Sequence, residues 1–129
     1  MFARNTIVLA IWFFPFVVCA EPQRLECNIK FGDFVDVYTV EIDANHNMVY
    51  STFHAASNKD RSVTLDYKIS SDAIINDDEV VYRANLHSLD YAYVINRKTL
   101  EIIRYINEID NAEVGRGLCH VIEASGKKL

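Results

Sequence analysis

Apolar and polar residues alternate one by one along most of the chain, whereas the three-to-four-residue period of an amphipathic helix is nearly absent. Residues 62–69, SVTLDYKI, give the clearest case. Single polar residues separate their apolar members, which are Val63, Leu65, Tyr67 and Ile69. Because successive side chains of a strand point to opposite faces of its sheet, this segment is predicted to be a strand with one buried face and one face in water.

Seven further segments have strand-like composition, rich in β-branched and aromatic residues. They are LECNIKF (25–31), FVDVYTVEID (34–43), MVYSTFH (48–54), EVVYRANL (79–86), DYAYVIN (90–96), TLEIIRYI (99–106) and LCHVIE (118–123). In the first, alternation predicts an inward face made of Leu25, Cys27, Ile29 and Phe31. Between strands, the Ile74-Ile75 pair of SSDAIINDDE (70–79) fits either a short strand or one helical turn.

Short connections rich in Gly, Asn, Asp and Ser, which are turn-forming residues, separate these segments. Strands of this length, about 10 residues apart, are typical of all-β domains. We therefore predict about eight antiparallel strands, arranged as a meander that closes into a small barrel or folds into a sandwich.

The stretch YAYVINRKTLEI (91–102) holds a short polar segment between two apolar ones. Its cations and amide could form a binding site, or the segment could be the corner of a hairpin. Alternation runs into Asn96 and out of Thr99, and Asn tolerates the backbone angles of tight turns. A hairpin turn is therefore the favoured interpretation, with Arg97 and Lys98 projecting into water.

The first twenty residues differ from the rest of the chain. Arg4 precedes an apolar run over 7–18, and Val18, Cys19 and Ala20 are small or branched residues at the positions that a signal peptidase reads. This is the three-part pattern of a secretory signal peptide, and the run is shorter than the roughly 20 residues of a membrane-spanning helix. We predict cleavage after Ala20; an uncleaved membrane anchor and lipidation of Cys19 are the alternatives.

Cleavage leaves residues 21–129 as one small soluble domain, without stable membrane insertion, in the periplasm or outside the cell. Its only cysteines are Cys27 and Cys119. An even pair in an exported chain is typical of a disulfide, which here would join the first strand to the last. By the chain-entropy model, closing a loop of about 90 residues contributes about 4–5 kcal/mol. The alternative, a reactive thiol pair, lacks the close Cys-x-x-Cys spacing.

The chain carries a net charge of −5, and loss of Arg4 with the signal peptide makes it −6, since residues 1–20 contain no acid. An acidic chain without basic clusters disfavours nucleic acid and anionic membrane surfaces as partners. Complementary charge would suit a cationic protein partner, and the same charge also serves solubility.

Metal and cofactor sites are not predicted. The four histidines (His46, His54, His87 and His120) have no ligand spacing, although His54 and His120 could meet in space. The segment DANHNM begins like a calcium loop, but Met48 and His54 replace its glycine and its final glutamate, so a turn is predicted. The acidic run 77–79 is interpreted as solvated.

Catalytic motifs are also missing from the sequence. There is no Gly-x-Ser-x-Gly segment, and Gly115 and Gly117 beside Arg116 fit a twist or bulge before the last strand. An enzyme is therefore not expected. The chain retains all seven tyrosines after cleavage. Alternation places Tyr38, Tyr67, Tyr82 and Tyr93 inward as core or barrel lining, although a protein-recognition surface also uses tyrosine.

The layout resembles that of small exported bacterial β-barrel proteins of mostly unknown function, which have one disulfide and a Y-x-I-[ND]-R-x-T hairpin near the end. The residues that carry this resemblance are Tyr93, Ile95, Asn96, Arg97, Thr99 and Cys119. In layout alone, the chain is also similar to periplasmic inhibitors of C-type lysozyme, disulfide-closed eight-stranded barrels. No functional residue carries over from that second similarity.

The sequence leads to a hypothesis of an exported, non-enzymatic binding protein, for instance an inhibitor or immunity-type protein for a cationic protein partner. A lipocalin-like carrier of a small apolar ligand is the alternative, since an eight-stranded barrel can be filled or can hold one ligand. A third possibility, an enzyme, requires a cleft with convergent carboxylates or histidines. The binding residues are unknown at this level.

Overall fold

The computed structural model describes residues 22–86, 88–106 and 112–122. Within these ranges the regular elements are strands: β1 (Gln23–Phe31), β2 (Phe34–Asp43), β3 (Met48–Ser57), β4 (Ser62–Ile75), β5 (Glu79–Leu86), β6 (Leu89–Asn96), β7 (Glu101–Ile106) and β8 (Ala112–Ile122). The predicted signal peptide, its cleavage site and Cys19 lie outside the described residues.

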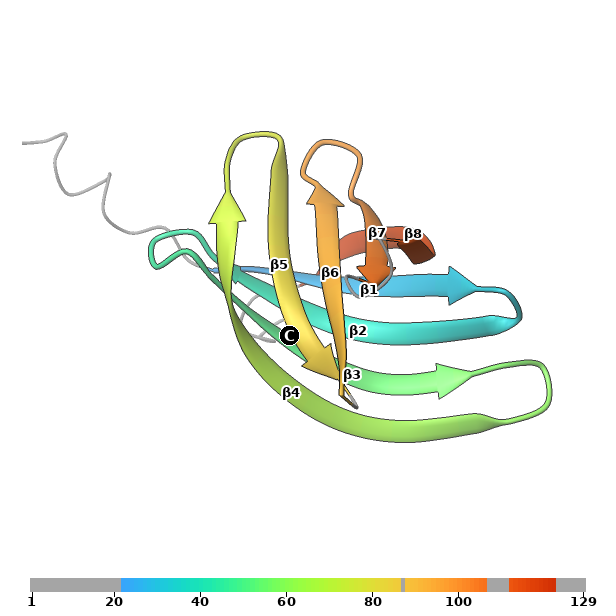
Figure 1. The fold of residues 1–129 in the computed structure, drawn as a ribbon. Coiled ribbons are helices and arrows are strands. Elements are labelled where there is room, and N and C mark those ends of the chain that lie inside the picture. Colours follow the sequence, from blue (N-terminus) through green and yellow to red (C-terminus); the bar gives the residue numbers. More distant parts are fainter. Residues whose placement is uncertain (1–21, 87, 107–111, 123–129) are drawn as a thin grey trace, which may run out of the picture.

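Each strand pairs antiparallel with the next, and β8 returns to pair with β1, so the meander closes into a barrel (Figure 1). The all-β prediction is confirmed, and the barrel rather than the sandwich forms. Ile74 and Ile75 are the end of β4, the strand alternative of the two considered. Cys27 lies directly opposite Cys119 on β1 and β8, and the two form the predicted disulfide.

The core lies where the inward faces of all eight strands meet. Its fully buried side chains include Tyr82, Tyr93, Leu25, Ile29, Ile95 and Ile102, which follow the predicted alternation. Two parts of that prediction are wrong. Phe31 is 52% exposed, because it lies at the tip of the β1–β2 hairpin, and Val63, Leu65 and Tyr67 of β4 are 47%, 36% and 45% exposed.

The exposure of β4 follows from its pairing. β3 accompanies β4 from Ser62 to Asp72, but β5 pairs only with Ala73–Ile75 of β4. Before Ala73, β4 and β5 separate, and we call this point the fork. Figure 1 shows the β1–β2 and β3–β4 hairpins extending well beyond the crossing strands β5 and β6. We call the extending part of β4, Ser62–Ser70, the overhang.

Two successive irregularities bend the sheet here. β3 has one extra residue, His54, relative to β2. β4 has one extra residue relative to β3, since Leu65 and Asp66 together lie opposite His54. Asp66 adopts a left-handed φ of 48°, which Asp tolerates better than most residues. Bulges of this kind increase the local twist and curve the strand, which accounts for the curved path of β4 in Figure 1.

The segment Asn96–Thr99 forms the predicted hairpin turn. Its Asn96 side-chain oxygen accepts hydrogen bonds from the backbone N–H groups of Lys98 (2.8 Å) and Thr99 (3.0 Å). The two cations do not simply project into water, as predicted, since the neighbouring turn lies within reach. Arg97 Nη1 donates to the backbone oxygen of Asn76 (2.7 Å), and Lys98 lies 3.2 Å from Asp78.

Candidate functional site at the open side of the barrel

A buried arginine lies at the end of the core nearest the overhang. Arg104 of β7 is 6% exposed, and its Nη1 donates to Asp36 Oδ2 (2.7 Å) and to the Tyr38 hydroxyl (3.0 Å). Its Nε and Nη2 donate to the backbone oxygen of Val114 (3.1 and 2.9 Å). A buried charge needs such partners, because removing the partner of a buried ion lowers the free energy of unfolding by about 3–5 kcal/mol.

Gly115 makes room for this arginine. β8 bulges opposite Arg104, and Gly115 adopts a φ of 138° there. A Cβ at this position would lie 2.6 Å from Ile29 Cγ2 and 3.2 Å from Arg104 Nη2. The predicted bulge is therefore present, although it lies inside β8, which begins at Ala112, and not before the last strand.

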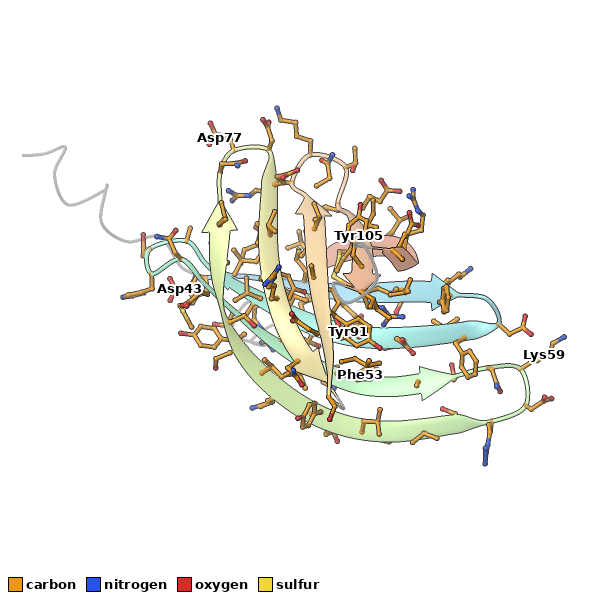
Figure 2. The ribbon with its side chains drawn as sticks, in the orientation of Figure 1. Asp43, Phe53, Lys59, Asp77, Tyr91 and Tyr105 are labelled. Carbon is orange, nitrogen blue, oxygen red and sulfur yellow. A yellow bond between two sulfur atoms is a disulfide. The ribbon has the colours of Figure 1, made fainter. Side chains whose placement is uncertain are left out.

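Three tyrosines continue the polar cluster across the barrel. The Tyr38 hydroxyl lies 3.0 Å from that of Tyr93, whose ring stacks on Tyr82 with centroids 4.9 Å apart. On the other side, Tyr38 stacks on Phe53 at 4.8 Å, and Arg104 lies over the Tyr91 ring at 5.3 Å. Figure 2 shows Tyr91 and Phe53 near the centre of the molecule, where β5 and β6 cross β2 and β3.

Burial controls the protonation of this cluster. It raises the pKa of Tyr82 and Tyr93 well above the usual range, and each also lies near Tyr38. Burial raises the pKa of Tyr38 as well, although Arg104 and the hydrogen bond from Tyr93 oppose the change. For Arg104, burial lowers the pKa, but Tyr38 and Asp36 outweigh it and the net direction is upward. The cluster is therefore a cation surrounded by neutral tyrosines and one carboxylate.

The overhang exposes a free strand edge. Among the described residues, β3 is the only strand that pairs with Ser62–Ser70, so the backbone edge facing away from β3 has no strand partner. Val63 lies opposite Ala56, which packs against the core, and Tyr67 lies opposite the buried Phe53. Opposite residues share a sheet face, so both belong to the inner face of the sheet. The overhang thus combines an open edge with exposed apolar side chains on its inner face.

Two buried hydroxyls lie at the fork. Ser71 Oγ and Tyr82 Oη are buried and have no hydrogen-bond partner among the described residues. Tyr82 pairs with Ala73, and Ser71 precedes Ala73 by two residues, so both lie on the inner face where β4 and β5 separate. An open cavity of about 550 Å³ is lined by both, together with Asp72 and Arg83. Polar groups at the fork are therefore available to something that enters between the strands.

The other residues considered from sequence lie apart. His54 contacts Thr39 and Asp66 on the outside of the barrel, whereas His120 lies 3.1 Å from Glu26, so the two histidines do not meet. His46 bonds Asp43 in the predicted turn (2.9 Å). His87 lies outside the described residues. Within the described ranges, no three His, Cys, Asp or Glu side chains come together as ligands for a metal ion.

The remaining predicted features are surface turns. Asp78 and Glu79 donate their backbone N–H groups to the Asn76 side chain (2.9 Å each). Arg116 pairs with Glu113 (2.6 Å) and Glu101 (3.3 Å) on the exposed face of β8.

Of the tyrosines predicted to face inward, Tyr38, Tyr82 and Tyr93 are buried, while Tyr67 lies on the exposed inner face of the overhang.

Sequence reasoning missed Arg104, Asp36 and the open edge. Arg104 stands in the run IIRYI two residues after the buried Ile102, at an inward position by alternation. A cation at an inward position of a strand was the available signal. The carboxylate partner is 68 residues away in sequence, and nothing in the pattern of either strand pairs them.

Comparisons with protein-family models, with curated proteins and with solved structures found no match. The described part of the chain contains no helix that is long and apolar enough to cross a membrane. The disulfide between β1 and β8 is consistent with an oxidising compartment outside the cytoplasm.

Proposed function

We propose that this is an exported binding protein that takes an extended segment of a cationic protein partner as an additional strand on β4. The observation that carries the proposal is the overhang, where Ser62–Ser70 is paired on one side by β3 and on the other by no described strand. A strand edge without a neighbouring strand is a template for another strand. Backbone hydrogen bonds would supply affinity, as in other complexes formed by strand addition.

The inner face of the overhang supports specificity for apolar side chains. Val63 and Leu65 are large and exposed, and Tyr67, further along the same strand, lies opposite the buried Phe53. In strand addition, alternate side chains of the added segment pack against such a face. A segment with apolar residues at every second position would therefore fit best.

The fork would receive the end of the added strand. β5 takes over the pairing of β4 at Ala73, so an added strand cannot continue past this point. The hydroxyls of Ser71 and Tyr82, which lack partners in the described structure, would bond its terminal backbone groups. Net negative charge, −5 for the whole chain, favours cationic flanks on the partner segment.

Carriage of a small apolar ligand has less support. Leu25, Ile29, Ile95 and Ile102 meet the stacked tyrosines in the core, each with at most 2% exposure. A barrel filled in this way corresponds to the packed rather than the ligand-holding type.

The test is selection from a displayed library of random ten-residue peptides, with the residues 21–129 protein as target and amide hydrogen exchange as readout. Bound peptides are expected to protect the backbone amides of Ser62–Ser70. Leu65→Lys, which puts a charge on the apolar inner face, should weaken binding at least about tenfold, the equivalent of about 1.4 kcal/mol. Leu118→Lys is the matched control, since Leu118 is a 64% exposed apolar residue of β8. Protection of another surface, or equal loss in both variants, would overturn the proposal.

A further inference from the structure

The outer face of the sheet carries a second arrangement, which includes Asp66 and Lys68 of the overhang. His54 of β3 lies between a hydroxyl and a carboxylate. Its Nε2 is 2.5 Å from Thr39 Oγ1 on β2, and its Nδ1 is 3.2 Å from Asp66 Oδ1 on β4. The three side chains come from three adjacent strands and form a chain from hydroxyl to imidazole to carboxylate.

The pairing of the three strands creates this alignment. Thr39 and Lys68 both pair with Thr52, so His54, two residues after Thr52, and Asp66, two residues before Lys68, share the outer face with Thr39. The register shifts of both pairings lie at this point, where His54 is the extra residue of β3 relative to β2. Asp66 also holds a left-handed φ of 48°. Bulges and unusual backbone conformations of this kind are concentrated near active sites.

The hydrogen-bond directions are fixed by the chemistry of the groups. A carboxylate accepts only, so the Nδ1–H of neutral His54 donates to Asp66 and leaves Nε2 as an acceptor. Nε2 then accepts the hydrogen bond donated by the Thr39 hydroxyl. This is the tautomer in which an imidazole can remove a proton from a hydroxyl, and a nucleophile, a base and an orienting group are the parts that activated hydroxyls require.

A groove lies directly over the three residues. It is an open cavity of about 550 Å³ whose lining includes Thr39, His54 and Asp66 together with Tyr50, Thr52 and Lys68. Lys68 supplies a cation to the same groove, and Tyr50, which is 40% exposed, supplies an apolar wall. The groove therefore offers space for a small substrate, a positive charge and an aromatic surface beside the hydroxyl.

We propose that Thr39 is the nucleophile of an acyl-transfer site that takes small carboxylic esters. Thr39 Oγ1 attacks the ester carbonyl carbon while its proton passes to His54 Nε2, and Lys68 faces the oxygen that becomes negative. His54 returns the proton to the departing alcohol, which leaves an acyl ester on Thr39. Water then attacks this ester and gives a proton to His54, the bond between the acyl carbon and Thr39 Oγ1 breaks, and His54 passes the proton to Thr39 Oγ1, so that the carboxylic acid leaves and the Thr39 hydroxyl and neutral His54 are restored.

The sequence carries no signal of this site. Thr39, His54 and Asp66 share no local motif, since 15 and 12 residues separate the successive partners. The convergence of a histidine and a carboxylate in a cleft is the feature that an enzyme would require. It exists because three strands that are separate in the sequence pair side by side.

The experiment uses p-nitrophenyl acetate with the residues 21–129 protein. A burst of nitrophenolate and a protein mass increased by one acetyl group, mapped by peptide fragmentation to Thr39, are expected. Thr39→Val should abolish the Thr39 adduct, and Thr39→Ser should retain it. His54→Gln should lower the acylation rate about a hundredfold or more, the scale of general-base catalysis. Asp66→Asn should have a smaller effect, because Asp66 is 70% exposed and therefore solvated.

The matched control is His120→Gln, which removes an exposed histidine that also contacts a carboxylate. It should leave the acylation rate unchanged, and circular dichroism should show that every variant is folded. An acetyl group found on Lys68 or elsewhere but not on Thr39, or equal rates in the wild-type protein and folded His54→Gln, would overturn the proposal and assign the three residues a structural role.

Discussion

Two segments with the same alternation have opposite environments. In β6, Tyr93 and Ile95 are 1% and 0% exposed, whereas in the overhang Val63 and Tyr67 are 47% and 45% exposed. Both pairs lie on the inner face of the sheet. The difference is the opposite wall: β6 faces β1–β3 across the closed part of the barrel, while β5 leaves β4 at the fork and does not cover the overhang. Alternation therefore specifies which face is apolar, but burial depends on a second layer.

Loss of the disulfide is expected to have the largest effect on the closed part. Reduction of Cys27–Cys119 removes the covalent link between β1 and β8 and should lower the free energy of unfolding by about 4–5 kcal/mol, because the unfolded chain regains loop entropy. Urea unfolding with and without a reductant measures the change. A difference below about 1 kcal/mol would show that pairing of β1 with β8 alone maintains closure.

Removal of the buried cation should be nearly as costly. Arg104→Met leaves Asp36, which is 13% exposed, without its cation, and breaking a buried pair costs about 3–5 kcal/mol. Urea unfolding measures the loss, and adding Asp36→Leu should recover most of it. The control is Arg116→Met, since Arg116 is exposed and its removal should leave stability unchanged within error. Equal effects of the two arginine variants would contradict the assignment of Arg104 to the core.

Alkaline pH should lower the free energy of unfolding through the buried tyrosines of the closed part. Burial raises the pKa of Tyr38, Tyr82 and Tyr93 in the folded protein. The unfolded chain therefore loses protons first, at pH above about 10, and each buried tyrosine lowers stability by about 1.4 kcal/mol per pH unit from there upward. Below pH 10 this stability is fully present.

Urea unfolding between pH 9 and 11 gives the slope of stability against pH. Tyr93→Phe removes one of the three tyrosines and should reduce the slope by about one third, while Leu65→Ser in the overhang, which removes no ionisable group, should leave it unchanged. Tyrosinate absorbance should rise for the core tyrosines only together with unfolding. Ionisation of all seven tyrosines in the folded protein near pH 10 would show that the core is open to water.

The smallest expected effect is that of an apolar substitution in the overhang. Leu65→Ser should change the free energy of unfolding by no more than about 0.5 kcal/mol, as at other surface positions. Ile95→Ala, at the equivalent inner face of the closed part, should cost about 2–5 kcal/mol. Thermal unfolding monitored by circular dichroism compares them. A large loss in Leu65→Ser would mean that the overhang is covered in solution.

The features of the fold that could be predicted are those that depend on residues close together in the sequence. Alternation and turn residues identified all eight strands and the Asn96–Thr99 turn, and the two remaining cysteines led to the correct disulfide. Boundaries were less accurate: β8 begins six residues earlier than predicted because the bulge at Gly115 interrupts its alternation. The assumption that Arg97 only contacts water failed because the adjacent turn is distant in sequence.

The candidate sites were not predictable in the same way. The role of Arg104 depends on Asp36 and on the bulge of β8 opposite it, and that of His54 depends on Thr39 and Asp66, which lie on two other strands. Bulges change register by single residues, and single-residue shifts leave no clear mark in a hydrophobic pattern.

The sequence by itself determined that this chain forms eight strands with one apolar face each, linked by short turns and tied at both ends by a disulfide, because side-chain alternation and turn chemistry are local properties. Only the tertiary structure decided where β4 and β5 separate, and therefore which apolar residues remain exposed and which strand edge stays open. The length of strand pairing, the positions of the bulges and the coverage of the inner face depend on all eight strands together, so these non-local contacts decide where the proposed partner and substrate would bind.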